Sequence, residues 1–190
     1  MCCCILIQFQ IRFENRKDGD TGEDCLLSDD GVDFLMQMSW VKQFNSIKFG
    51  KSGHSALRYE IGLCIKTGNI CWDNGPFEPG MYNDNMIFQM GLAGMLEEGE
   101  RVEADKGYRH SAPEHIRYPG WLEPPERAAM TQRVRCRHET VNKRMKQWNI
   151  LRAAYRHDML KHQQVFGAIL ALTQLSIENG EPLFQVEYLD

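Results

Sequence analysis

The sequence lacks any stretch that is long and apolar enough to cross a bilayer. Its longest apolar segments, such as VFGAILAL, are far shorter than the roughly 20 residues that a spanning helix needs. The opening MCCCILIQFQ has neither the basic region nor the small-residue cleavage site of a secretory signal. We therefore expect no membrane insertion and no secretion. The 190 residues, 43% of them hydrophobic, are enough for one soluble domain with a substantial core.

Patterns typical of zinc sites and disulfide frameworks are also absent. No two of the seven cysteines are spaced as CxxC, and the six histidines form no HExxH motif. Scattered cysteines in odd number favour reduced thiols inside the cell. No Ser-His-Asp or Cys-His arrangement stands out, so the sequence does not indicate a covalent nucleophile.

Charge is distributed unevenly along the chain, although the formal net charge is only -4. Residues 126–161 hold ten Lys and Arg against three Asp and Glu, whereas the rest of the chain holds 12 basic and 23 acidic residues. A basic segment beside an acidic remainder suits a protein that contacts phosphates on one surface and keeps carboxylates for a metal elsewhere. A solvated helical face explains the same charges. The charge pattern alone leaves both interpretations open.

The first half of the chain predicts short β-strands. Apolar residues on both sides of Asp29 and Asp30 predict one strand, and the runs LRYEIGLCI and NICWDN around Lys66–Gly68 predict a β-hairpin. Residues 100–104 predict a further short strand that ends at Asp105. Asp30 and Asp105 thus lie in or directly after strands.

A helix is predicted to begin near Asp84, because apolar residues follow it at helical spacing. Asp is a favoured helix N-cap, so capping and a metal-linked role both explain this carboxylate. Residues 109–125 contain four prolines and predict an irregular connector. The later VFGAILALTQLSIENG predicts a buried helix that ends at Asn179-Gly180.

A long helix is predicted from Glu126 onward. Glu139 falls off its apolar stripe, together with Arg135, Asn142, Lys143 and Lys146. An ion pair of Glu139 with Arg135 or Lys143, four residues away, is an alternative to a metal role. The apolar stripe itself comprises Ala128, Met130, Val134, Val141, Met145 and Trp148.

Four carboxylates from separate segments, Asp30, Asp84, Asp105 and Glu139, are the kind of ligands that a hard cation such as Mg²⁺ requires. Such ions hold phosphates during chemistry on nucleic acids. An alternative is a structural or interaction domain in which these acids are surface charges.

The segments around these acids resemble the DDE superfamily of transposase endonucleases, in its PIF/Harbinger-like branch. The resemblance covers most of the chain and runs in order through DCLLSDDGVDF, LRYEIGLCIKTGNICWDNGPFEPG, NDNMIF, VEADKGY, RHETVNKRMKQWNIL and LTQLSIENGEPLF. It implies an α/β fold with a ribonuclease H-like mixed sheet flanked by helices. It also implies that residues 25–190 form the catalytic domain, that residues 1–24 are a partial N-terminal segment, and that an upstream DNA-binding region is lacking.

The same resemblance assigns the site residues. Asp30, Asp105 and Glu139 correspond to the catalytic acids, and Asp84 to a further acid that is often counted with the metal ligands. Together they imply two Mg²⁺ or Mn²⁺ ions and an in-line attack on a DNA phosphodiester by water or a 3′-hydroxyl. Contacts to the DNA backbone are expected from nearby basic residues: Lys106, Arg135, Arg137, Lys143 and Lys146.

Two acids depart from the family pattern. Asp29 stands where relatives usually have an apolar residue, and Asp33 adds a further carboxylate nearby. Burial raises the pKa of such crowded acids unless a metal or a basic group compensates.

DNA is the partner that the resemblance implies, together with a separate DNA-binding protein, a nuclear location and no membrane. An alternative is a transposase-derived protein that keeps the fold and binds DNA or another partner without cutting.

Overall fold

The computed structural model describes residues 25–36, 55–108, 115–118 and 124–186. The expected N-terminal segment, residues 1–24, lies outside the described residues, so the division of the chain stays a prediction. No helix in the described part is long and apolar enough to cross a membrane.

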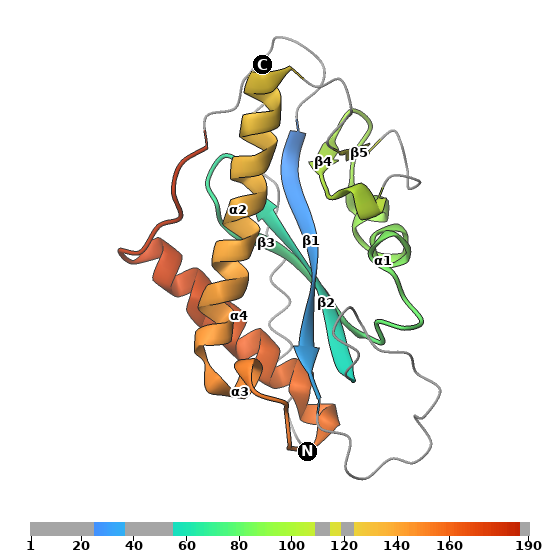
Figure 1. Ribbon diagram of the computed structural model, residues 1–190, viewed down its shortest axis with the longest axis vertical. Helices are drawn as coiled ribbons and strands as arrows, with labels where there is room; N and C mark the ends of the chain where they lie inside the picture. The colour runs from blue at the N-terminus through green and yellow to red at the C-terminus, as the bar shows by residue number, and fades with distance from the viewer. Residues whose placement is uncertain (1–24, 37–54, 109–114, 119–123, 187–190) are drawn as a thin grey trace.

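Five strands form one mixed sheet in the order β3-β2-β1-β4-β5. The pairs β1–β2 and β2–β3 are antiparallel, whereas β1–β4 and β4–β5 are parallel. Parallel neighbours require a crossover connection, and α1 lies on the path from β3 to β4 (Figure 1). The strands are β1 (Cys25–Leu35), β2 (Ala56–Cys64), β3 (Ile70–Phe77), β4 (Arg101–Glu103) and β5 (Ile116–Arg117).

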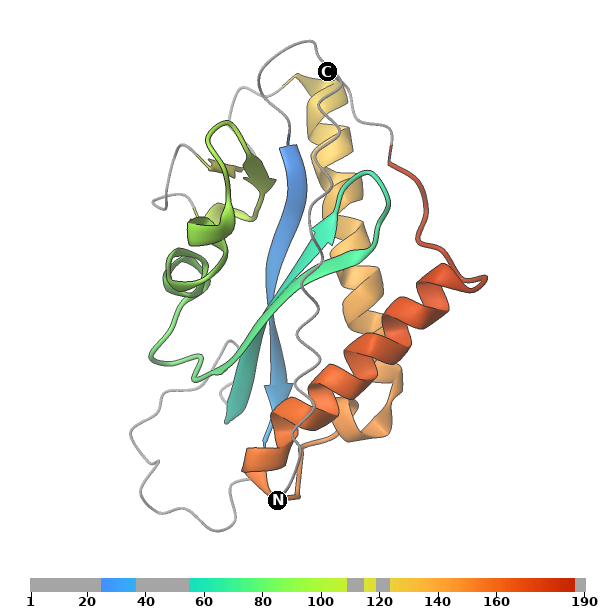
Figure 2. The ribbon, with the colours of Figure 1, turned by 180° about the vertical axis from the view of Figure 1, so that it is seen from behind.

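Helices lie on both faces of this sheet. Figures 1 and 2 show α2 and α4 on one side of β1, and α1 with its following 3-10 turn on the other. This arrangement confirms the α/β class and the ribonuclease H-like mixed sheet flanked by helices. The helices are α1 (Asp84–Met90), α2 (Pro125–Gln147), α3 (Asn149–Arg152) and α4 (His162–Glu178), with 3-10 turns η2 (Leu92–Met95), η3 (Lys106–Tyr108) and η4 (Met159–Lys161).

The predicted hairpin is formed by β2 and β3. Gly68 N donates to Cys64 O at 2.8 Å and Cys64 N donates to Asn69 O at 2.9 Å, which closes the turn. Gly68 has a φ of 78°, a value that glycine adopts without strain. The strand-rich reading of this part of the chain is thus confirmed.

Alternate residues of β1 face opposite layers, because successive side chains of a strand point to opposite faces. Val32 and Phe34 belong to the core between the sheet and helices α2 and α4, whereas Leu27 belongs to the core beneath α1. By this alternation Asp30 shares the α2 face, and Asp29 and Asp33 share the α1 face. The acids of β1 therefore lie on the two opposite faces of the sheet.

Helix α2 begins one residue before the predicted start and buries most of the predicted stripe. Ala128 and Trp148 are exposed because they lie near the two ends of the helix, where the sheet does not cover them. The buried stripe also contains polar residues that the apolar pattern did not include. Its members are Met130, Thr131, Val134, Arg137, His138, Val141 and Met145.

Candidate functional site

Asp30 and Asp105 are brought together by the parallel pair β1–β4. In this pair Ser28 lies opposite Glu103, and Asp30 and Asp105 each follow two residues later along the same direction. The charge of Asp105 raises the pKa of Asp30. The two carboxylates that the sequence predicted at strands therefore share one electrostatic environment.

Asp84 approaches β1 from the α1 layer, at the residue next to Asp30. It is the first residue of α1, and a Cβ at Gly31 of β1 would overlap Asp84 Oδ1. Glycine at this position lets the carboxylate approach the strand. The helix is capped instead by Asn83, whose side chain accepts from Met86 N at 2.8 Å. Capping therefore does not explain Asp84.

Asp84 and Asp105 affect the ionisation of Asp30. Burial, followed by the charges of Asp84 and Asp105, raises the pKa of Asp30 from 3.8 to about 6. A backbone hydrogen bond from Gly31 and the positive charge of Arg135 act in the opposite direction. A divalent cation is attracted to a place where the charge of one carboxylate, here Asp30, is disfavoured by its neighbours.

Arg58 of β2 links Asp33 to Asp84. Its Nε and Nη2 donate to the two oxygens of Asp33 at 2.7 and 2.9 Å, and its Nη1 lies 2.9 Å from Asp84 Oδ1. The hydrogen bond to Asp33 is the main reason that the pKa of Arg58 is raised. The positive charge of Arg58 thus compensates the negative charge of Asp33. Arg58 was not among the predicted site residues. The available signal was a charged residue in the middle of an apolar strand.

Arg135 of α2 pairs with Asp105. Its Nη2 lies 3.4 Å from Asp105 Oδ1, and the two side chains are 50% and 40% exposed. An exposed pair at this distance stabilises the fold little. Both groups remain accessible to solvent and to a ligand.

Glu139 lies one helical turn beyond Arg135. Its neighbour His138 is buried and shares a 2.7 Å hydrogen bond with Ser28 of β1, so this part of α2 lies beside the start of β1. The side chain of Glu139 is exposed, and no ion pair joins it to another described residue. The alternative of a helical ion pair with Arg135 is not what the structure contains. The structure places Glu139 on the helix over this face without joining it to the three aspartates.

The ligand chemistry of these acids fits a hard cation, because every donor is a carboxylate oxygen. As they stand, no three His, Cys, Asp or Glu side chains among the described residues form a metal-binding group. Asp84 is paired with Arg58 and Asp105 with Arg135.

A buried acid pair lies next to this site on the α1 face. Asp29 is 3% exposed and Glu60 is 1% exposed. Burial comes first among the effects that raise the pKa of each, and the charge of Glu60 raises the pKa of Asp29 further. Trp72 Nε1 donates to Glu60 Oε2 at 2.7 Å. Burial therefore disfavours the charged form of both acids, and the hydrogen bond from Trp72 opposes this effect at Glu60.

Arg137 corrects one of the predicted DNA contacts. It is 1% exposed, its Nε donates to Phe184 O at 2.8 Å, and its Nη1 donates to Ile65 O. We call residues 181–186 the C-terminal strap. Arg137 lies three residues after Val134 and four before Val141, on the apolar stripe, and this spacing was the signal for burial. Its guanidinium holds the strap and is not available to a phosphate.

The other predicted backbone contacts lie at the surface to different degrees. Lys106 and Lys143 are exposed, as is Arg135. Lys146 is partly buried, with its ammonium 5.4 Å from the ring centre of Phe34. Three of the five predicted residues are therefore well placed to meet a ligand.

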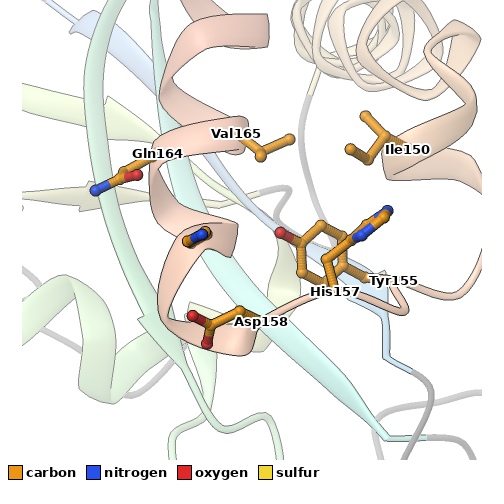
Figure 3. A pocket seen from close by; sticks show the side chains of 7 residues that line it. Ile150, Tyr155, His157, Asp158, Gln164 and Val165 are labelled. Carbon is orange, nitrogen blue, oxygen red and sulfur yellow. The ribbon is translucent and has the colours of Figure 1, made fainter.

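A separate hollow of about 420 Å³ lies beyond the end of β1, where Tyr155 N donates to Leu35 O. Figure 3 shows its lining from α3, from the segment between α3 and α4, and from α4 itself. None of the predicted site residues lines it. It is lined by Ile150, Tyr155, His157, Asp158, Lys161, Gln164 and Val165.

No family model matches the chain, and a search of curated proteins gave no match.

Proposed function

We propose that this chain is a metal-dependent DNA endonuclease of the DDE transposase type, which transfers phosphoryl groups on DNA phosphodiesters. The observation that carries the proposal is that Asp84 and Asp105 both lie close enough to Asp30, at the β1–β4 pair, for their charges to raise its pKa. These residues come from a strand, a helix start and a strand end that are far apart in the sequence. The motif resemblance described above supplies the reaction class.

Asp30, Asp84 and Asp105 are the proposed ligands of Mg²⁺ or Mn²⁺, and Glu139 of α2 is the proposed fourth ligand. Such ions, two in this class of site, lower the pKa of an attacking water or 3′-hydroxyl and stabilise the leaving oxygen. Burial already disfavours the charged form of Asp30 and raises its pKa. Binding of a cation therefore favours its ionised form.

Basic side chains next to the acids have the task of holding the DNA backbone. Lys106 follows Asp105 directly, and Arg135 pairs with it. Lys143 lies one helical turn beyond Glu139 on the exposed face of α2. Their position around the carboxylates suits phosphate contacts, which position DNA without reading its sequence. Sequence recognition is then the task of a separate DNA-binding partner, and a nuclear location follows from such a substrate.

Nicking of supercoiled plasmid in the presence of Mg²⁺ or Mn²⁺ tests the proposal. We expect Asp30→Asn and Glu139→Gln to abolish nicking. Glu126→Gln is the matched control, since it removes an exposed acid from the first turn of the same helix. Nicking by the wild type that persists in both site variants contradicts the proposal.

A second candidate is a transposase-derived protein that binds DNA or another partner without cutting. One observation favours it: Arg58 and Arg135 already neutralise two of the aspartates. The same assay separates the candidates when combined with a DNA-binding measurement. Binding that depends on Lys143 without any metal-dependent nicking supports the second candidate.

A further inference from the structure

Arg58 is a cation built into the carboxylate site. The residue is only 8% exposed, and each of its three guanidinium nitrogens faces an acid. Asp33 accepts hydrogen bonds from Nε and Nη2, and Nη1 forms the ion pair with Asp84. The side chain therefore has one strong partner and one weaker partner, because a two-bond carboxylate contact holds a guanidinium more firmly than a single bond.

The oxygen of Asp84 that contacts Arg58 is also the one that lies against β1. Asp84 Oδ1 is the atom that a Cβ at Gly31 would overlap, so it is the carboxylate oxygen that lies against β1, and the charge of Asp84 raises the pKa of Asp30. The same Oδ1 lies 2.9 Å from Arg58 Nη1. An ion that used this oxygen would have to share it with the guanidinium or replace it.

We propose that Arg58 is an internal cation that occupies Asp84 and is exchanged for a divalent metal ion when the ion binds. This inference rests on the proposed function, because it assumes that Asp84 is a metal ligand. Asp33 is the anchor in this exchange. It keeps two bonds to Arg58 when Asp84 leaves, so the guanidinium stays beside the site as a fixed positive charge that lowers the metal affinity.

The exchange predicts opposite effects for the two partners. Arg58→Gln removes the competing cation, and we expect the affinity for Mn²⁺ to rise roughly five- to tenfold, in the usual range of coupling between sites. Asp33→Asn removes the anchor, so Arg58 turns fully to Asp84, and the affinity falls. A variant that merely loosens the fold lowers the affinity in both cases.

Asp84→Asn separates exchange from a general charge effect. In this background Arg58 has no carboxylate to release, so we expect Arg58→Gln to lose most of its effect on the affinity. Arg152→Gln is the matched charge control. It removes an exposed arginine from α3 that donates to Asn149 Oδ1 at 3.0 Å and contacts none of the proposed ligands, and we expect a change of less than about twofold.

The experiment is a titration with Mn²⁺ in the absence of DNA, read by the paramagnetic resonance signal of the free ion. Circular dichroism and thermal melting check that each variant is folded. If Arg58→Gln leaves the affinity unchanged or lowers it, while Asp30→Asn still abolishes binding, the metal site stands and the exchange is overturned. If Arg58→Gln does not fold, Asp33→Asn decides, since an unchanged or higher affinity overturns the exchange. Absence of any binding that depends on Asp30 overturns both this inference and the proposed metal centre.

Discussion

Replacing Arg137 with methionine tests whether this arginine holds the C-terminal strap or contacts DNA. Methionine occupies a similar space but leaves the carbonyls of Phe184 and Ile65 without the donors that Arg137 supplies. Each hydrogen bond from a charged group contributes about 1.5–3 kcal/mol. Burial lowers the pKa of Arg137, which shows that removing the guanidinium from water offsets part of this gain. We expect the free energy of unfolding to fall by about 2–4 kcal/mol.

The assay is urea unfolding followed by tryptophan fluorescence, with Arg133→Met as the control on the same helix. Arg133 is exposed and donates one bond, from Nη2 to Gln185 O at 2.9 Å, so its loss is expected to cost less than about 1 kcal/mol. The salt dependence of DNA binding by folded Arg137→Met is expected to match that of the wild type. Wild-type stability together with a salt dependence that is weaker by about one phosphate contact would refute the reasoning.

Three further outcomes follow from the structure. Gly31→Ala is expected to lower the affinity for Mn²⁺ because the new Cβ displaces the carboxylate of Asp84, whereas Gly94→Ala, with no atom within 4 Å, leaves the affinity unchanged; isothermal titration measures both. Burial lowers the pKa of His162 from 6.5 to about 4, so the unfolded chain binds a proton that the folded chain excludes as the pH falls through this window. The free energy of unfolding is then expected to fall by about 2 kcal/mol between neutral pH and about pH 5. In His162→Gln this contribution to the fall is absent, and urea unfolding at the two pH values measures the difference. Lys143→Gln is expected to weaken DNA binding for all sequences alike and to reduce the salt dependence by about one contact, and an unchanged salt dependence in a mobility-shift assay contradicts this role.

Local patterns in the sequence predicted most elements that position the site. The strand around Asp30, the hairpin at Gly68 and the strand before Asp105 are all present. The predicted helix after Asp84 forms as α1, but it breaks at Gly91 and continues as a 3-10 turn. These features depend on side-chain alternation, helical periodicity and turn chemistry, which act over a few residues.

The partners of the charged residues were much less predictable. The basic segment looked like one phosphate-binding surface, yet Arg137 is buried, and Arg133 and Arg144 donate to carbonyls of the C-terminal strap. For Arg137 the spacing along the apolar stripe carried a signal for burial. For the other two, only the course of the strap beside α2 reveals their acceptors.

The sequence by itself determined most of the strands and helices, their order, and the positions of Asp30 within a strand, Asp84 at a helix start and Asp105 after a strand. Only the tertiary structure decided that Arg58 joins Asp33 to Asp84, because this contact depends on the register of β1 against β2 and on where α1 begins relative to Gly31. Periodicity is a property of neighbouring residues, whereas the partner of a charge is set by segments that meet only after the chain has folded.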